Sequence, residues 1–465
     1  MIKAQAFNMM VLSDTHLLAP QLTGDGPAMA RAERTNPGMM ARSDEIMAAV
    51  CDSIVAARPR VVLITGDLTR NGEALSHQRM VEHLQRLRQA GITVLVVPGN
   101  HDVNNPGAVG YRGEERVPTP TVTRDEFRSL YADFGYGGTN PQDTASLSYA
   151  CELAPDVLLL ALDTNRDEEN TLIGRGDSAN TYHNAGRIKA ATLQWAVEQA
   201  TRARARGQRV MAMMHHHLAP HFDAEPQLLP SYIVAGHDEA CRALRAAGVE
   251  VVFTGHLHVG DIATLQMDCG TMTDVATASL TTYPFSWREV VVAPGELRVS
   301  THRLDALPSC PELRSVGRKK IEAAAPMFVD RLSGRLWKKL ERALPAMQRY
   351  ATAGGRLPAD KRQLAALLHP CFDDLAVTAV MAVVEGDEAA TSVATEVLTR
   401  ARDCVNGLKQ SMLNDKGREM ADFIIAEAMP VVERHVMSVL ADRNQAGTPH
   451  ECVTPDNTAV IPFGR

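Results

Sequence analysis

Residues 61–67 have the sequence VVLITGD, a short apolar run that ends in Gly66 and Asp67. An apolar run of this length, followed at once by a turn, is typical of a fully buried β-strand. Similar runs occur along the first half of the chain, and we expect a strand at each of them: Met9 to Leu12, Val61 to Thr65, Thr93 to Val97, Val157 to Leu162, Arg209 to Met214 and Val249 to Thr254.

Segments with helical periodicity separate these runs, and several of them begin at Ser, Asp or Thr and end at Gly. We expect helices at Ser43 to Ala57, Ala74 to Ala90, Ala190 to Arg206 and Gly236 to Ala247. Strands that alternate with helices indicate a layered α/β architecture.

Composition places the chain in the globular class, with 45% hydrophobic and 22% charged residues. Its 465 residues are too many for one ordinary core, so a large domain and at least one smaller one are expected. The formal net charge of -7 lacks the basic footprint of a protein that binds nucleic-acid polymers. The N-terminus does not resemble a signal peptide, which predicts a cytoplasmic protein. No run approaches the ~18 uninterrupted apolar residues of a membrane span, so we expect no membrane insertion.

The eight cysteines are scattered singly, without a Cys-x-x-Cys pair that would suggest a zinc or redox site. Without a signal peptide, reduced thiols are the better prediction. We expect these side chains to be small, buried apolar groups without a chemical role: Cys51, Cys151, Cys241, Cys269, Cys310, Cys371, Cys404 and Cys452.

Beyond about Leu307 the strand pattern stops and long Ala, Leu, Glu and Arg-rich segments follow. We therefore predict a catalytic domain over 1–306, a helical domain over 307–443 and an irregular or loose tail over 444–465. Leucines at i, i+4 spacing run from Leu332 to Leu344, and further helices are expected at Lys361 to Leu368, Asp373 to Val384, Ala389 to Leu413 and Gly417 to Leu440. We expect Pro370 to break a helix and Pro430 to kink one.

Five polar blocks directly follow the predicted strands: Ser13-Asp14-Thr15-His16, Gly66-Asp67, Gly99-Asn100-His101-Asp102, His215-His216-His217 and Gly255-His256-Leu257-His258. Open α/β sheets bind ligands at the carboxyl ends of their strands. Carboxylate, amide oxygen and imidazole are ligands that suit manganese, iron or zinc. Side-chain alternation along an extended segment would place Asp14 and His16 on one side, and His256 and His258 likewise.

Asp67 is central to these blocks and could bridge two cations held about 3.5 to 4 Å apart, with a bridging hydroxide as the nucleophile. His101 need not bind metal and could protonate the leaving oxygen or stabilise the transition state. Asp102 follows it and could orient its imidazole. Each block alone also fits an ordinary strand-end turn or Asx turn. The occurrence of all five in order favours the metal centre.

The same order of blocks resembles the calcineurin-like metallophosphoesterase superfamily, over about Met9 to Arg303. The resemblance implies a four-layer α/β/β/α sandwich with an additional all-helical C-terminal domain. It also implies one cation at Asp14, His16, Asp67 and His258, a second at Asp67, Asn100, His215 and His256, and a catalytic role for His101. The family usually has Pro directly after its two or three histidines, whereas Pro220 is displaced here, so His216 remains an alternative to His215.

Softer matches resemble bacterial class III cyclic-nucleotide phosphodiesterases, including Gly66 to Glu73, Pro98 and Leu162 to Asn165. Two long irregular segments, Leu18 to Arg42 and Asn104 to Thr123, follow metal-binding turns and are expected to bind substrate or act as lids. Candidates for phosphate or base contacts are Arg70, Tyr111, Arg112, Arg116, Arg166 and Tyr283.

The leading hypothesis is hydrolysis of a small phosphodiester, such as a cyclic nucleotide, by metal-bound hydroxide, with manganese or iron as the expected ions and zinc as a further option. A phosphomonoesterase or protein phosphatase could use the same site. A non-catalytic binding scaffold would lack ligands, and none is missing. A nuclease acting on long DNA would need a basic groove. The helical domain could cover the site, brace the sheet or form a homodimer.

Overall fold

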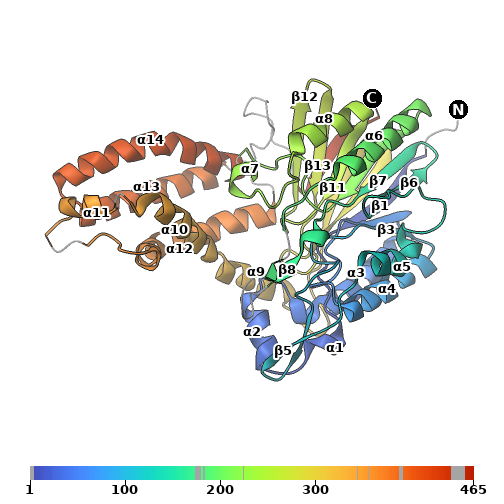
Figure 1. The fold of residues 1–465 in the computed structure, drawn as a ribbon, viewed down its shortest axis with the longest axis horizontal. Coiled ribbons are helices and arrows are strands. Elements are labelled where there is room, and N and C mark those ends of the chain that lie inside the picture. Colours follow the sequence, from blue (N-terminus) through green and yellow to red (C-terminus); the bar gives the residue numbers. More distant parts are fainter. Residues whose placement is uncertain are drawn as a thin grey trace. The chain divides into compact units, whose positions relative to one another are not determined.

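The computed structural model describes residues 5–172, 180–181, 184–223, 225–342, 344–353, 356–386, 391–440 and 456–464. The chain forms two compact units (Figure 1). The first comprises Met1–Arg318 together with Asn444–Arg465, and the second comprises Lys319–Arg443. The boundary at Arg318 lies beyond the predicted one at residue 306, because the last turns before it pack with the first unit.

The first sheet has six strands in the order β16-β15-β14-β1-β2-β3. Strands β1, β2 and β3 are parallel, and the others join by antiparallel pairing. Their bounds are β1 (Phe7–Leu12), β2 (Val61–Ile64), β3 (Thr93–Val96), β14 (Ser286–Ala293), β15 (Gly295–Arg303) and β16 (Thr458–Phe463).

The second sheet also has six strands, in the order β12-β13-β11-β10-β7-β6. Its four central strands are parallel, and its two edge strands are antiparallel to their neighbours. The Tyr149 hydroxyl donates to the Val96 carbonyl at 2.9 Å and so links the two sheets. The bounds are β6 (Tyr149–Ala154), β7 (Val157–Leu162), β10 (Arg209–Met214), β11 (Val249–Thr254), β12 (Asp261–Met267) and β13 (Gly270–Ala276).

Helices cover the sheets on their outer sides (Figure 1). Helix α4 (Ala74–Gln89) packs on β3 and on α3 (Ser43–Ala57), while α6 (Ala190–Ala205) and α8 (His237–Ala247) pack on the second sheet. The core under α6 and α8 is fully buried and aliphatic, with Leu160, Ala196 and Leu244 among its members. The predicted fold class, an α/β sandwich with a helical C-terminal region, is confirmed.

Both segments predicted as irregular lids contain regular structure. Residues after Leu18 form α1 (Pro20–Thr23), α2 (Pro27–Thr35) and η1 (Met40–Arg42), and residues after Asn104 form a hairpin of β4 (Val109–Arg112) and β5 (Glu115–Pro118). They share a small apolar cluster that includes Leu22, Met29 and Tyr111. We call this assembly, residues 18–42 with 109–118, the wall. Shorter elements of the unit are α5 (Arg124–Leu130), η2 (Ala132–Phe134), η3 (Asp167–Glu169), β8 (Thr171–Leu172), β9 (Asn180–Thr181) and α7 (Glu225–Leu228).

The C-terminal segment differs from the predicted loose tail. Residues Thr458–Phe463 form β16, which pairs antiparallel with β15 at the edge of the first sheet. Pro462 fits there because an edge strand needs only one side of its backbone for the ladder. The prediction of an irregular tail is therefore wrong for these residues.

The second unit is helical, as predicted. Its elements are α9 (Leu313–Ala324), which begins in the first unit, α10 (Met327–Leu340), α11 (Leu344–Met347), η4 (Gln348–Tyr350), α12 (Lys361–Glu385), α13 (Thr391–Met412) and α14 (Asp415–Leu440). Helix α12 continues through Pro370, so the predicted break there is wrong. Leu368 before the proline and Phe372 after it pack in one apolar cluster, which holds the two halves of the helix together and offsets the lost hydrogen bond.

Helix α12 has the length and composition of a membrane span, although polar residues interrupt its apolar sequence. Its best window has a mean hydropathy of 1.6, and 22% of that window is buried. A single helix of this kind is weak evidence, because core helices of other proteins pass the same test. The absence of membrane insertion stays a prediction.

A disulfide joins Cys371 on α12 to Cys404 on α13. The prediction of reduced thiols is therefore wrong for these two residues, which lie in different helices and could not be paired from their spacing. Cys51, Cys241 and Cys310 are free and buried, as expected, whereas free Cys269 is exposed and free Cys151 is half-buried. The remaining predicted thiol, Cys452, lies outside the described residues.

Removal of this disulfide is expected to destabilise the helical unit. The bond closes a loop with a sequence separation of 33 residues, and loops of that size correspond to about 4 kcal/mol of stability. The double variant Cys371→Ser/Cys404→Ser, or the wild type in dithiothreitol, should unfold this unit at a lower temperature in calorimetry. Cys269→Ser is the control and should leave the transition unchanged. A transition of the helical unit that is insensitive to reduction would contradict the bond.

Candidate metal centre

The five predicted blocks meet at one end of the two sheets. Their side chains form two groups, Asp14, His16, Asp67 and His258, and Asp67, His215 and His256. Within each group one ligand atom per residue lies within 4.8 Å of all the others. Asp67 belongs to both groups, so its carboxylate lies where a bridge between two cations is needed.

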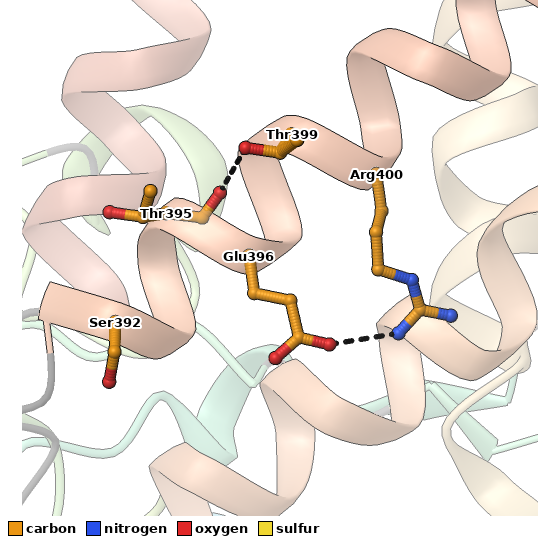
Figure 2. A pocket seen from close by; sticks show the side chains of 5 residues that line it. All are labelled: Ser392, Thr395, Glu396, Thr399 and Arg400. Carbon is orange, nitrogen blue, oxygen red and sulfur yellow. Dashed lines mark hydrogen bonds and ion pairs between the residues drawn. The ribbon is translucent and has the colours of Figure 1, made fainter.

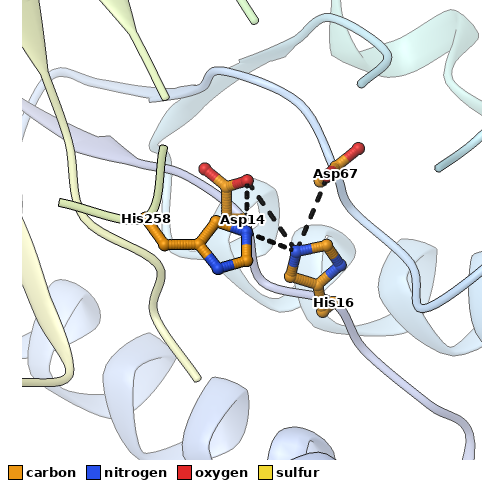
Figure 3. Close-up of side chains that lie close together, drawn as sticks. All are labelled: Asp14, His16, Asp67 and His258. Carbon is orange, nitrogen blue, oxygen red and sulfur yellow. Dashed lines mark hydrogen bonds and ion pairs between the residues drawn. The ribbon is translucent and has the colours of Figure 1, made fainter. Parts of the chain in front are cut away.

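The first group is tightly clustered (Figure 3). The Nε2 atoms of His16 and His258 are 3.0 Å apart. Asp14 Oδ1 is 3.2 Å from His258 Nε2, and Asp67 Oδ2 is 3.6 Å from His16 Nε2. Two imidazole nitrogens and two carboxylate oxygens thus point toward one another from three separate strand ends.

The second group is organised around His215. Its Nε2 lies 3.4 Å from Asp67 Oδ2 and 2.9 Å from Asn100 Oδ1. Its Nδ1 donates to the Thr65 carbonyl at 2.9 Å, which fixes the ring and turns Nε2 toward the centre. Burial lowers the pKa of His215, but the Asp67 carboxylate outweighs that effect and raises the pKa to about 9. Metal binding at this position would release that proton.

The backbone at the ligands is unusual. Asp14, His16, Asp67, His256 and His258 all have positive φ, at 48°, 39°, 49°, 69° and 67°. This left-handed region is unfavourable for residues with a Cβ, and such strain concentrates at functional sites. The predicted reason for the alignment of these side chains, alternation along an extended strand, is therefore wrong. Left-handed turns after the strands aim the side chains inward.

Two glycines of the blocks are required by close approach. A Cβ on Gly99 would lie 2.1 Å from Asp67 Oδ1, and a Cβ on Gly255 would lie 1.8 Å from Ser13 Oγ. Any side chain at either position would displace a neighbouring ligand-bearing turn. These glycines belong to the motif because the turns touch one another.

The donor set fits divalent cations. Asp14 Oδ2 accepts hydrogen bonds from Ser13 Oγ and the His256 amide, at 2.5 and 2.9 Å, while buried Oδ1 accepts none. Burial raises the pKa of Asp14, but His258 outweighs it and brings the pKa to about 2. Oδ2 of Asp14 is thus held by two hydrogen bonds. Oδ1 carries no proton and faces a cluster of imidazole nitrogens. A cation is the partner that such an arrangement lacks.

His101 lies beside the centre without joining either ligand group. Its amide donates to Asp67 Oδ1 at 2.8 Å, and its Nε2 lies 3.8 Å from Asp67 Oδ2. Its Nδ1 is 2.7 Å from the Arg70 carbonyl and 2.9 Å from Asn71 Oδ1, so Nδ1 carries the hydrogen of the neutral ring. Burial lowers the pKa of His101 to about 4, against the opposing effect of Asp67.

Asp102 has a different role from the predicted one. Its carboxylate accepts from the amides of Gly99, Leu68 and Thr69 at 2.8, 3.0 and 2.9 Å. It therefore stabilises the turn that carries Asp67 and does not orient His101. Burial raises the pKa of Asp102 to about 7, and the nearby Asp67 charge adds to the effect. The Arg70 carbonyl and Asn71 Oδ1 orient His101 instead, and the only sequence signal for Asn71 was its place in the Gly66 to Glu73 match.

The other two histidines of the triple run are engaged elsewhere. His216 Nδ1 is 2.8 Å from Thr164 Oγ1, and its Nε2 is 2.8 Å from the Asn184 carbonyl. His217 Nδ1 is 2.7 Å from Glu225 Oε1. Both ring nitrogens of His216 thus have protein partners, and these contacts favour His215 as the ligand.

Most of the predicted substrate contacts have other partners. Tyr111 is buried in the wall, and Tyr283 is buried with the Arg314 guanidinium 5.8 Å from its ring. Arg166 pairs with Glu169. Arg112 is exposed and Arg116 half-buried. Arg70 is different: its Nε is buried without a hydrogen-bond acceptor, and it forms no ion pair among the described residues.

His77 lies behind the centre and should make stability depend on pH. Its Nδ1 is 2.8 Å from the Tyr131 hydroxyl and its Nε2 is 2.9 Å from the Asp102 carbonyl. Burial lowers the pKa of His77 from 6.5 to about 4. Between about pH 4 and pH 6.5, the unfolded chain therefore binds a proton at His77 that the folded chain does not bind. The contribution of neutral His77 to the free energy of unfolding is complete above about pH 6.5, and about 3 kcal/mol of it is lost as the pH falls toward 4.

The measurement is urea unfolding of wild type and His77→Gln at about pH 7 and about pH 5. The variant should be less stable at the higher pH, and its stability should change less between the two values. Equal pH dependence in both proteins would contradict the buried neutral state of His77.

A pocket in the helical unit holds none of the predicted site residues. It encloses about 490 Å³ along one face of α13 and is lined by Ser392, Thr395, Glu396, Thr399 and Arg400 (Figure 2). The Arg400 guanidinium pairs with Glu396 at 3.3 Å. This pocket therefore lacks the convergent donors of the metal centre.

Comparison with known proteins identifies the first unit. The model of the calcineurin-like phosphoesterase family matches residues 7–260, a range that contains every predicted ligand. No curated protein sequence matches the chain. Among solved structures, a dimetal phosphatase from Danio rerio is 15% identical, with 64% of this chain and 96% of that chain covered at a TM-score of 0.43.

Two further structures are similar over comparable lengths. The sulfate thiohydrolase SoxB from Thermus thermophilus is 15% identical, with 68% of this chain and 60% of that chain covered at a TM-score of 0.34. A predicted phosphoesterase from Streptococcus pneumoniae is 14% identical, with 64% and 91% covered at a TM-score of 0.25. The assignment rests on the family match, which spans more than half of the sequence and both ligand groups. The chain belongs to the calcineurin-like phosphoesterase family and is a metal-dependent phosphoesterase.

Proposed function

We propose that the chain hydrolyses a small phosphodiester, such as a cyclic nucleotide. The observation that carries the proposal is the position of Asp67 Oδ2, which lies 3.6 Å from His16 Nε2 and 3.4 Å from His215 Nε2. A carboxylate shared in this way keeps two cation positions close enough to act on one phosphate. Two bound divalent cations would neutralise the phosphate charge and lower the pKa of a water molecule.

His101 is the proposed proton donor to the leaving oxygen. Its Nδ1–H is held by Arg70 and Asn71, so Nε2 is the atom that faces the centre. Donation requires a proton on Nε2, and the low pKa of the free site keeps that atom bare. The negative charge of a bound phosphate favours the imidazolium form. We therefore expect His101 to take up a proton when substrate binds.

The preference for a diester rests on the number of free cations around the centre. A diester has two non-bridging oxygens, and a monoester has three that also need donors. The Arg70 guanidinium forms no ion pair among the described residues, and its charge helps to lower the pKa of His101, which places it within electrostatic reach of the centre. Two cation positions and one arginine are enough to contact the two non-bridging oxygens of a diester.

Arg70→Ala is expected to raise the KM for a diester substrate about 10-fold, because one charge-assisted hydrogen bond to phosphate is lost. Arg166→Ala is a suitable control, since its guanidinium already pairs with Glu169 and should leave KM unchanged. The measurement is steady-state hydrolysis of bis(p-nitrophenyl) phosphate. Equal KM values for Arg70→Ala and wild type would remove Arg70 from the substrate site.

The experiment that tests the proposed reaction compares two chromogenic substrates. The manganese-loaded enzyme should hydrolyse bis(p-nitrophenyl) phosphate faster than p-nitrophenyl phosphate, and should also act on a cyclic nucleotide. A strong preference for the monoester would contradict the proposal and favour a phosphomonoesterase or protein phosphatase. The identity of the native metals, a cytoplasmic location and a homodimer through the helical unit stay predictions.

A further inference from the structure

A second buried cluster of charged side chains lies behind the metal centre, and no role follows for it from the family motif. It consists of His217, His221, Glu225, Asp261 and Asp274, and we call it the rear network. All but Asp261 are fully or almost fully buried. The rings of His217 and His221 contact each other at a tilt of 44°, with centroids 4.0 Å apart.

The network is paired internally. His221 Nδ1 is 3.0 Å from Asp261 Oδ2, and its Nε2 is 3.4 Å from Asp274 Oδ1. Glu225 accepts from the His221 amide at 2.7 Å and contacts His217 Nδ1 at 2.7 Å. Burial lowers the pKa of His221, but the two facing carboxylates raise it well above its usual value. A cation between two anions explains why these charges can be buried together.

Asp274 connects the network to both histidine-bearing turns of the second metal position. Its Oδ2 accepts from the amides of Leu218 and Ala219, at 2.7 and 3.0 Å, directly after the triple histidine. Its Oδ1 accepts from the Thr254 hydroxyl at 2.5 Å, two residues before His256. One carboxylate on a central strand therefore holds the chain after His215 and the chain before His256.

The first metal position also has supports of its own. Asp14 is anchored by Ser13 Oγ, and its carbonyl accepts from Ser279 Oγ at 2.9 Å. The turn that carries His256 and His258 is common to both positions, because the His256 amide donates to Asp14 Oδ2 at 2.9 Å. Asp274 therefore holds both histidine turns of the second position, whereas it reaches the first position only through this common turn.

We propose that the rear network, through Asp274, positions His215 and His256 and so controls the affinity of the second metal position more strongly than that of the first. This inference rests on the dimetal centre of the proposed function. Residues behind the ligands of a metal commonly change its affinity by about 10- to 100-fold when substituted. Asp274 is a positioning residue, because it acts on His215 and His256 through the two amides and the hydroxyl that donate to its carboxylate.

The test is Mn²⁺ binding to the full chain by equilibrium dialysis, with electron paramagnetic resonance to distinguish coupled pairs from single ions. Asp274→Asn should weaken the second Mn²⁺ about 10- to 100-fold, weaken the first clearly less and convert the coupled spectrum into that of a single ion at limiting metal. High Mn²⁺ should restore the coupled spectrum. A purely structural defect would not remove one ion selectively.

Two further variants keep the test decisive. Thr254→Val removes only the hydroxyl that donates to Asp274 and keeps the branched shape, so it should weaken the second ion in the same direction if Asp274→Asn fails to fold. Asp44→Asn is the matched control, because Asp44 also pairs with a buried histidine, His83 at 2.7 Å, away from the centre. It should bind both ions as the wild type does.

The outcomes separate this inference from the function beneath it. Wild type with two ions, together with Asp274→Asn and Thr254→Val that bind both with unchanged affinity, would overturn the inference alone. A wild-type chain that bound no Mn²⁺ would overturn the dimetal centre and this inference with it.

Discussion

Replacing Asp67 with asparagine is expected to lower kcat by about 1000-fold or more, the equivalent of about 4 kcal/mol of transition-state stabilisation. Asp67 is the one residue common to both ligand groups, and its carboxylate also accepts from the His101 amide. An amide keeps the size of the side chain but removes the negative charge that two cations would share. Metal content should fall together with the rate.

The check on Asp67→Asn is to measure kcat for bis(p-nitrophenyl) phosphate and bound metal on the same preparation. Asp44→Asn removes a carboxylate that pairs with a buried histidine outside the centre and should retain both activity and metal. An Asp67→Asn enzyme with near wild-type turnover would show that the shared carboxylate does not organise the site.

Substitution of His101 by glutamine should have the second largest effect, but with metal retained. General acid catalysis typically contributes about 100- to 10,000-fold, and kcat should fall within that range. The imidazole belongs to neither ligand group, so bound metal should stay at the wild-type level. The loss should be smaller for a substrate whose leaving group needs no proton, such as a p-nitrophenyl ester, than for a cyclic nucleotide.

His77→Gln provides the control for this experiment, because His77 is also a buried imidazole near the Asp102 turn but faces Tyr131 and not the centre. Its kcat should be close to that of the wild type. A His101→Gln enzyme that lost its metal, or that kept full activity on both substrates, would contradict the assigned role.

The strands and helices that carry the centre could be predicted from the sequence because their signals are local. Predicted strands at Val157 to Leu162, Arg209 to Met214 and Val249 to Thr254 agree with β7, β10 and β11 residue for residue. Buried parallel strands are continuous apolar runs, and periodicity finds them. The predicted helix from Ser43 to Ala57 likewise agrees with α3.

Elements held by distant partners could not be predicted in this way. Strand β16 forms only because β15, more than 150 residues earlier in the chain, offers an open edge. Helix α12 continues through Pro370 because tertiary packing outweighs a local breaking signal. The Cys371–Cys404 bond depends on the approach of two helices. Each depends on contacts that spacing does not record.

The candidate site shows the same division. The ligand residues were found because each block is a short motif, and the structure brings all of them together. Their convergence depends on left-handed turns such as those at Asp14 and His258, where alternation had suggested an extended strand. The residues behind them come from other segments: Asn71, which orients His101, lies only in the softer Gly66 to Glu73 match, and Asp274, behind the histidine turns, carries no motif.

The most direct test of the dimetal centre is to measure metal content and hydrolysis on one preparation of the wild-type chain before chelation, after chelation and after addition of Mn²⁺. We predict two divalent ions per chain, loss of bis(p-nitrophenyl) phosphate hydrolysis with the metal, and recovery of both on reconstitution. A chain that binds no divalent ion, or that hydrolyses the diester equally well after chelation, would contradict the account.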